Sequence, residues 1–185
     1  MTEKFDKLIK KILMEMSTRA RPIKVNASDF QNKWHKHHDN LQPVEDLHIN
    51  GNIINVQMFQ FDSYIEFYLV QDNSLVIGYI ELEVQDDGGV TIMYIWNSGQ
   101  IGSIMYKIYT EFLLDNFEYV KSDSIHTPKG FLLWKSFADD SKLQVYVLDE
   151  TDPSTTQILV KNGEELEQYF GDETKMKYIY KLTRK

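Results

Sequence analysis

Residues 90–149 decide the fold of this chain. They read VTIMYIWN (90–97), IGSIMYKIYTEFLLDNF (101–117), YVKSDS (119–124), PKGFLLWKSFADD (128–140) and KLQVYVLD (142–149). The first and last segments alternate with the two-residue period of strands, whereas the second and fourth have the three-to-four-residue spacing of helices. Strands separated by helices of this length predict parallel or mixed pairing with right-handed crossovers. The stretch therefore predicts a central strand-helix-strand-helix-strand unit in an α/β (α+β) domain.

Two details sharpen this prediction. Segment 90–97 has so few polar residues that we expect a central strand covered on both faces. The helix at 128–140 opens with Thr127-Pro128, where the missing N–H of proline costs nothing. The unit should therefore sit in the interior of the sheet, with its helices packed on it.

Further strands are predicted on either side of this unit. Residues 49–61, 64–71 and 74–85 read as strands separated by short turns, which predicts an antiparallel meander leading into residue 90. A last strand at 176–182 is expected to pair antiparallel with 143–148. The predicted fold is a mixed sheet with an N-terminal meander, the central unit and a C-terminal antiparallel strand.

This order resembles the core of the GNAT acyltransferase superfamily over about residues 52–149. In that family a central strand splays from its neighbour, and the helix after it presents its N-terminus to the pyrophosphate of coenzyme A. A helix N-terminus suits an anion because its backbone N–H groups and its dipole point at it. The family loop, roughly Gln/Arg-x-x-Gly-x-Gly/Ala, corresponds here to Asn97-Ser98-Gly99-Gln100-Ile101-Gly102.

Within that loop Ile101 and Gly102 fit the family pattern, while Asn97 and Gln100 replace its first cation or amide and its first glycine. The resemblance implies acetyl-CoA or another acyl-CoA as the cofactor and an amine-bearing acceptor as the partner. The cofactor contacts that it implies are Trp96, Asn97, Gln100, Ile101, Gly102 and Ser103.

Three carboxylates are candidates for catalysis. Glu81 and Glu83 share one face of their strand, and the resemblance implies that one of them is the general base, the alternative being solvent-facing carboxylates without a role. Asp123 lies near His126 and could form an acid/base pair with it, although His126 also suits a helix cap or a surface position.

A departure from the family leaves a second function open. The family tyrosine that often acts as general acid corresponds to Trp134, whose indole cannot donate a proton in that role. We therefore carry two hypotheses: an acyl-CoA-dependent N-acyltransferase, and a catalytically inactive GNAT-fold bacteriophage protein that is packaged in the head or otherwise virion-associated.

The N-terminus supports the second hypothesis. Residues 1–22 read as a short amphipathic helix, which needs a surface to bury its apolar stripe, whether on its own chain, on a capsid or scaffold protein, or at a membrane interface. Leu13-Met14-Glu15 resembles the cleavage motif of sorting peptides in tailed-phage head proteins, which implies a processing site at Glu15-Met16. Residues 23–185 are expected to form a single domain. The stripe consists of Phe5, Leu8, Ile9, Ile12, Leu13 and Met16.

Composition limits the remaining function classes. The 185 residues carry a net charge of −8, and residues 37–185 hold eleven Lys or Arg against twenty-four Asp or Glu, so we expect no nucleic-acid binding. There is no cysteine and no apolar run near the ~18 residues that span a bilayer, which predicts a soluble cytoplasmic protein, in the host cytoplasm or the virion if phage-encoded. His35, His37 and His38 beside Asp39 read as a solvated cluster, and we assign no metal.

Overall fold

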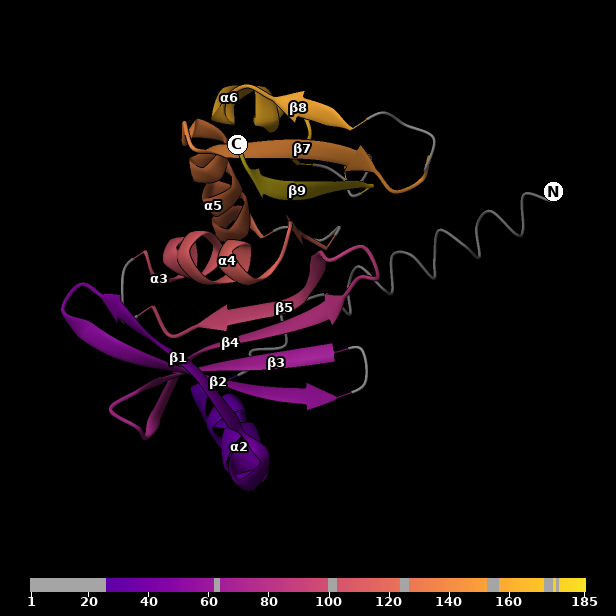
Figure 1. Ribbon diagram of the computed structural model, residues 1–185. Coiled ribbons are helices and arrows are strands. Elements are labelled where there is room, and N and C mark those ends of the chain that lie inside the picture. The colour runs from indigo at the N-terminus through magenta and orange to yellow at the C-terminus, as the bar shows by residue number, and fades with distance from the viewer. Residues whose placement is uncertain are drawn as a thin grey trace.

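The computed structural model describes residues 26–61, 64–99, 103–123, 127–152, 157–171, 175 and 177–185. In these residues nine strands form one mixed sheet in the order β1-β2-β3-β4-β5-β6-β9-β7-β8, which confirms the predicted α+β class. Figure 1 shows the meander β1–β5 at one end and β7, β8 and β9 at the other, with helices between them.

The meander contains one strand more than predicted. The sequence predicts a single strand across residues 49–61, but the chain reverses at Asn50-Gly51, where both φ angles are positive (51° and 79°). An Asn-Gly pair favours this tight hairpin turn, because both central residues need positive φ. The strands are β1 (Gln42–Ile49), β2 (Asn52–Phe61), β3 (Tyr64–Gln71), β4 (Leu75–Val84) and β5 (Val90–Asn97).

The second half of the sheet contains the strands of the predicted central unit and the predicted last strand. Strands β5 and β6 pair in parallel, and β9 lies between β6 and β7, antiparallel to both. This confirms the expected pairing of the last strand. The elements are α3 (Ile104–Lys107), η2 (Ile108–Leu113), α4 (Leu114–Asn116), β6 (Val120–Lys121), α5 (Pro128–Asp139), β7 (Leu143–Asp149), β8 (Ile158–Val160), α6 (Gly163–Glu167) and β9 (Tyr178–Arg184).

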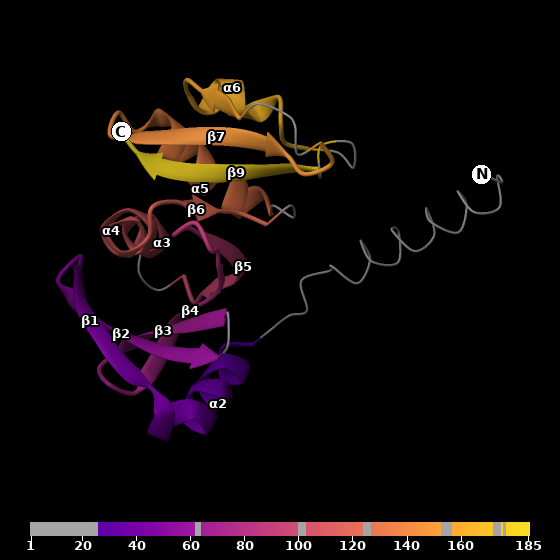
Figure 2. The ribbon, with the colours of Figure 1, turned by 45° about the vertical axis from the view of Figure 1, so that its right-hand side comes forward.

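Helices cover both faces of the meander. On one face α3, η2 and α4 form one helical segment, and Phe112 of η2 meets Phe67 of β3 edge to face at 5.0 Å. On the other face lies α2 (Ala27–His37), followed by the 3₁₀ turn η1 (His38–Asn40), and Phe30 of α2 stacks on Tyr79 of β4 at 4.7 Å. Figure 2 shows α2 and the α3–α4 segment on opposite sides of the meander.

The central strand is less covered than its sequence predicts. Val90 and Ile92 are buried, but Met93 and Tyr94 expose 40% and 38% of their surface. The pairing of β4 with β5 shifts by one residue between Glu81 and Leu82, so Met93 is an extra residue that bends the strand. The expectation of a strand covered along its whole length is therefore wrong beyond Ile92.

Several predictions fall outside this part of the chain. The helix predicted at residues 1–22, its apolar stripe and the Glu15-Met16 site are all outside the described residues, as is His126. None of the helices in the described ranges is long and apolar enough to cross a membrane.

Candidate functional site

The two edges of β5 have very different partners. Seven residues of β5 pair with β4, from Val90 opposite Val84 to Asn97 opposite Gly78. Only two pair with β6, Val90 with Val120 and Thr91 with Lys121. Among the described residues, β5 therefore has no strand partner on the β6 side from Ile92 to Asn97. We call this segment the open edge of β5.

The open edge presents backbone hydrogen-bonding groups. Ser98, directly after the strand, donates its N–H to the carbonyl of Ile77 in β4 at 2.9 Å. Since alternate residues of a strand point the same way, the N–H groups of Ile95 and Asn97 are directed away from β4. An extended ligand with amide groups can pair with such an edge.

The loop after β5 leads into the helix. The side-chain oxygen of Asn97 accepts a hydrogen bond from the N–H of Gly99 at 3.0 Å, which fixes a tight turn in which Gly99 has φ of 74°. Ser103 also has a positive φ, and α3 begins at the next residue. The remaining predicted loop contacts, Gln100, Ile101 and Gly102, lie outside the described residues.

Trp96, another predicted cofactor contact, packs on the α2 side of the strand. Its ring stacks on Phe30 at 4.8 Å, and it joins the smaller apolar cluster under α2. Side chains of directly opposite residues share a face, so Trp96 faces the same way as Tyr79.

Cross-strand rows organise the α2 face of the meander. The pairings put Phe59, Glu66, Glu81 and Tyr94 in one row across β2, β3, β4 and β5. The next row towards the end of the sheet holds Phe61, Tyr64 and Glu83. Two carboxylates, Glu66 and Glu81, are thus direct neighbours, an arrangement that costs energy unless cations or hydrogen bonds compensate it.

Lys33 of α2 supplies the compensation. Its Nζ lies 2.5 Å from a carboxylate oxygen of Glu66 and donates to the hydroxyl of Tyr79 at 2.6 Å. Tyr79 in turn donates to Glu81 at 2.8 Å, and Tyr68 donates to Glu66 at 2.7 Å. Burial first, and the neighbouring carboxylates next, raise the pKa of both tyrosines far above the ordinary value, so both phenols stay protonated.

A groove opens beside this network. It has a volume of about 450 Å³, and Glu66 and Glu81 contribute its carboxylates. Its other walls are aromatic: His37 stacks on Phe59 at 4.0 Å, and Phe61 is 61% exposed. The full lining is His37, Phe59, Phe61, Tyr64, Glu66 and Glu81.

The other predicted catalytic residues occupy different positions. Glu83 accepts a hydrogen bond from Gln85 at 3.3 Å and lies opposite Thr91, where β5 is still paired with β6. Asp123 follows β6, and its charge adds to the effect of burial in raising the pKa of Tyr109 in η2. The structure therefore places Glu81, but not Glu83, opposite the open edge of β5.

Sequence reasoning missed four members of the network: Lys33, Glu66, Tyr68 and Tyr79. The sequence contains part of this information. Glu66 and Tyr68 are two residues apart in one strand, and Tyr79 and Glu81 are two residues apart in the next, so the side chains of each pair share a face. This spacing does not reveal which residues of two strands lie opposite each other.

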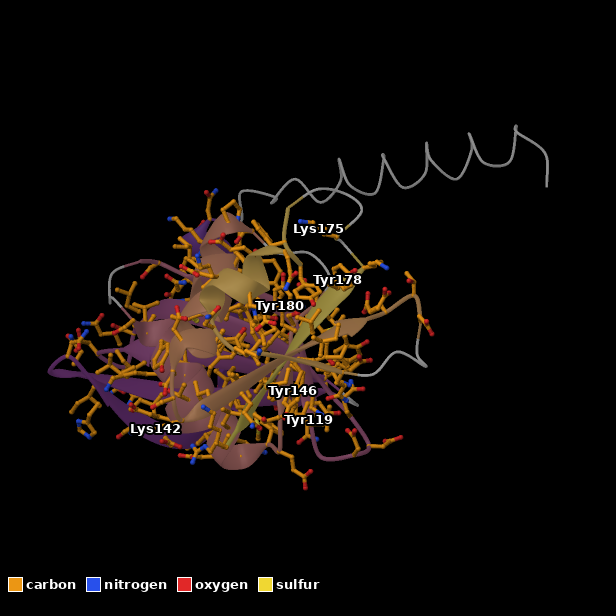
Figure 3. All side chains as sticks on the ribbon, turned by 90° about the horizontal axis from the view of Figure 1, so that it is seen from above. Tyr119, Lys142, Tyr146, Lys175, Tyr178 and Tyr180 are labelled. Carbon is orange, nitrogen blue, oxygen red and sulfur yellow. The ribbon has the colours of Figure 1, made fainter. Side chains whose placement is uncertain are left out.

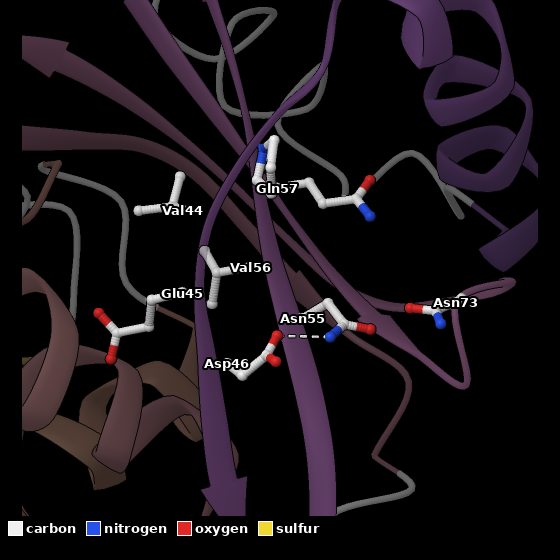
Figure 4. Close-up of a pocket in the computed structure, with 8 residues that line it drawn as sticks. Val44, Glu45, Asp46, Asn55, Val56, Gln57 and Asn73 are labelled. Carbon is white, nitrogen blue, oxygen red and sulfur yellow. Dashed lines mark hydrogen bonds between the residues drawn. The ribbon is translucent and has the colours of Figure 1, made fainter.

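A second hollow, of about 330 Å³, lies on β1 and β2 at the far edge of the sheet. Figure 4 shows the carboxylate of Asp46 bound to the amide of Asn55, at 2.5 Å, and Glu45 pointing away from that pair. In the described ranges no three His, Asp or Glu side chains converge as metal ligands.

A tyrosine-rich region lies in the C-terminal half. Figure 3 labels Tyr119, Tyr146, Tyr178 and Tyr180, which come from the segment before β6 and from β7 and β9. The ring of Tyr119 lies under the ammonium groups of Lys181 and Lys121, at 4.1 and 4.9 Å, and its hydroxyl donates to Asp87. These contacts stabilise the end of the sheet where β5 and β6 are paired.

Comparison with known proteins identifies no family for this chain. No protein-family model matches the chain, and no curated protein matches it in sequence.

Proposed function

We propose that this protein is a GNAT-like N-acyltransferase, which takes an acyl group from an acyl-CoA and passes it to an amine. The observation that carries the proposal is the parting of β5 from β6 after Thr91. The succession of β5, the helical segment, β6, α5 and β7 further supports it, because this is the strand-helix-strand-helix-strand unit from which the sequence resemblance starts.

The open edge of β5 suits the pantetheine arm of an acyl-CoA. That arm carries amide groups, and the N–H groups of Ile95 and Asn97 point to the open side, so the arm can add to β5 as a further strand. The helical segment from Ile104 to Asn116 starts just beyond, where its N-terminus would favour the pyrophosphate. Gln100, Ile101, Gly102 and Ser103 remain the proposed contacts of that anion.

Glu81 is the best-placed base for the transfer. It lies opposite Tyr94 within the open part of β5, one strand away from the edge. In the reaction the acceptor nitrogen bonds to the acyl carbon as the carbon–sulfur bond breaks, and coenzyme A leaves as a thiolate that solvent protonates. Glu81, or a water that it orders, takes the proton from the amine.

Calorimetric titration with acetyl-CoA tests the binding step. We expect saturable binding by the full chain, weakened at least about tenfold in Ile95→Pro, because proline removes the N–H on the open side. Val44→Pro, at the bulge of edge strand β1, is the matched control and should bind as the wild type does. Absence of heat at high micromolar acetyl-CoA would overturn the proposal.

A thiol-release assay tests the chemistry. Glu81→Gln should lower kcat by about 10²–10⁴-fold, while acetyl-CoA still binds with unchanged affinity, because the side chain keeps its shape and loses its basicity. Glu45→Gln should keep kcat within about threefold, since Glu45 lies on β1, three strands away from the strand of Glu81. Equal losses in the two variants would contradict the assignment of Glu81.

One observation favours the second function, a catalytically inactive phage protein. Trp134, at the position of the family general acid, is only 3% exposed and packs against Phe137 and Tyr180 in the core. On this interpretation residues 1–22 would bind a capsid or scaffold protein, and deleting residues 2–16 would abolish incorporation into heads. Undiminished incorporation of the truncated chain would contradict it.

A further inference from the structure

The face of the meander that holds the groove has an excess of negative charge. Glu66, Glu81 and Glu83 lie in two adjacent rows of the same face, and Lys33 is the one cation that pairs with any of them among the described residues. The side chain of Glu66 is only 14% exposed, so its charge is poorly screened by water. The face therefore favours a ligand with positive charge.

The groove walls indicate an organic cation and not a metal ion. Aromatic rings are not metal ligands, but they attract ammonium groups through their π faces and pack against methylene chains. Lys33 demonstrates this chemistry, because its ammonium lies 4.7 Å from the ring centroid of Tyr79 while it pairs with Glu66. Phe61 and Tyr64 offer comparable surfaces at the rim.

The spacing of the carboxylates points to two positive charges. Glu81 and Glu83 are two residues apart on one strand, which separates their backbones by about 6.6 Å, a distance that a short methylene chain spans. The volume of the groove, about 450 Å³, lies in the range for small ligands and not for a protein surface.

We propose that this groove binds a short aliphatic diamine. One ammonium group pairs with Glu81 beside Glu66, the second lies towards Tyr64 and Glu83, and the methylene chain lies against Phe59 and Phe61. That the bound diamine is also the acyl acceptor rests on the function proposed above, because Glu81 is the base in that scheme. The binding itself does not depend on acyl transfer.

Calorimetry on the full chain without acyl-CoA tests this inference. The probes are 1,4-diaminobutane, butylamine and 1-butanol, and we expect affinity to fall in that order, with the diamine at least about tenfold tighter than the monoamine. Glu81→Gln should weaken the diamine at least about tenfold, and Glu83→Gln should remove its advantage over butylamine.

Two further variants separate the groove from general effects. Phe61→Ala should weaken both amines about threefold or more, and it should fold normally because Phe61 is 61% exposed. Glu45→Gln removes the same charge from β1 and should change neither affinity beyond about twofold. Thermal melting of each variant checks that the fold is retained.

The outcomes are distinguishable from those of the proposed function. If the diamine gives no heat at 10 mM, or binds Glu81→Gln as tightly as the wild type, the groove is not a diamine site, whatever acetyl-CoA does. If butylamine binds as tightly as the diamine, the proposal that a second ammonium group is bound near Glu83 is refuted. Diamine binding without acetyl-CoA binding would keep this inference and overturn the transferase.

Discussion

The two edges of β5 differ in how many residues pair with the neighbouring strand. On the β4 side seven residue pairs hold the strand along its whole length, with one bulge at Met93, whereas on the β6 side two pairs hold it and the rest of its edge is open. The halves of the sheet are nevertheless joined by one apolar core, which runs from Leu47 of β1 to Leu182 of β9. Beyond these two pairs, side-chain packing under the helices joins the halves at this strand.

Hydrogen exchange should show the largest contrast between the two sides. The amide of Trp96 points to β4 and should exchange only through opening of the fold, which costs about 5–15 kcal/mol in a typical domain. The amide of Ile95 points to the open edge and should exchange with an opening free energy lower by several kcal/mol, on the order of the values for surface segments. Two-dimensional NMR in D₂O measures both amides.

Acetyl-CoA sharpens this experiment. If the ligand pairs with the open edge, saturation should slow exchange at Ile95 and leave Trp96 unchanged. Equal protection of the two amides in the free protein would mean that the open edge is already satisfied, and would contradict the description of β5 given above.

The core packing between the helical segment and the meander can be disrupted at Phe112. This side chain is 1% exposed and reaches from η2 to Phe67 of β3. Phe112→Ala should lower the free energy of unfolding by about 3–5 kcal/mol, because it leaves a cavity where the helix joins the meander. Urea denaturation measures the change, and Leu132→Ala, at a 62% exposed position on α5, should cost less than about 0.5 kcal/mol.

The paired end of β5 can be loosened at Gly89. A Cβ at this position would lie 2.0 Å from the ring of Tyr119, whose carbonyl accepts the N–H of Val90 at 3.1 Å. Gly89→Ala should therefore destabilise the fold by about 1–3 kcal/mol through overpacking. Combined with Tyr119→Leu, the two effects should be clearly non-additive in urea denaturation, and simple addition would refute the contact.

The smallest expected effect on stability concerns a hydrogen bond between α3 and the end of α5. Tyr106 of α3 donates to Asp140 at the end of α5, which holds the pKa of Asp140 below its usual range, while burial and then this bond raise the pKa of Tyr106 to about 12. Tyr106→Phe should cost about 1 kcal/mol at pH 7 and return the pKa of Asp140 towards about 3.9.

The pH dependence follows from these directions. The lowered pKa of Asp140 contributes stability above about pH 4, which is lost as the pH falls through its folded value. The raised pKa of Tyr106 contributes stability below about pH 10, which is lost as the pH rises towards 12. Urea denaturation across this range should give a flatter profile for Tyr106→Phe, and an unchanged profile would contradict this hydrogen bond.

Much of the fold could be predicted because its signals are local. The periodicity of residues 90–149 places β5, the helical segment, α5 and β7. Helix α5 begins at Pro128 as expected, and Thr127 caps it by accepting the N–H of Gly130 at 3.1 Å. The errors also have local causes. The strand pattern of residues 49–61 runs through the turn at Asn50-Gly51. Around His35 the sequence is polar, and the only indication of helix α2 there is the four-residue spacing of Phe30 and Trp34.

The candidate site could be predicted only in part, because it depends on register. Glu81 was expected from its own strand, but its neighbour Glu66 follows from the pairing of β3 with β4, which shifts between Leu69 and Val70. A one-residue slip would put these carboxylates on different faces. The position of Lys33 depends in addition on how α2 crosses the sheet, which no periodicity encodes.

The π-helical stretch η2 has a consequence for how this segment tolerates change. Ile108, Tyr109, Phe112 and Leu113 of this stretch all lie in the core, and its wider turn sets how the residues before and after it are aligned. Such a stretch amounts to one inserted residue, so deleting Thr110 would restore uniform α-helical winding without rotating the residues that follow it. The loop end of the segment and β6 would then keep their mutual alignment, which makes η2 the place where this helical segment can lose a residue.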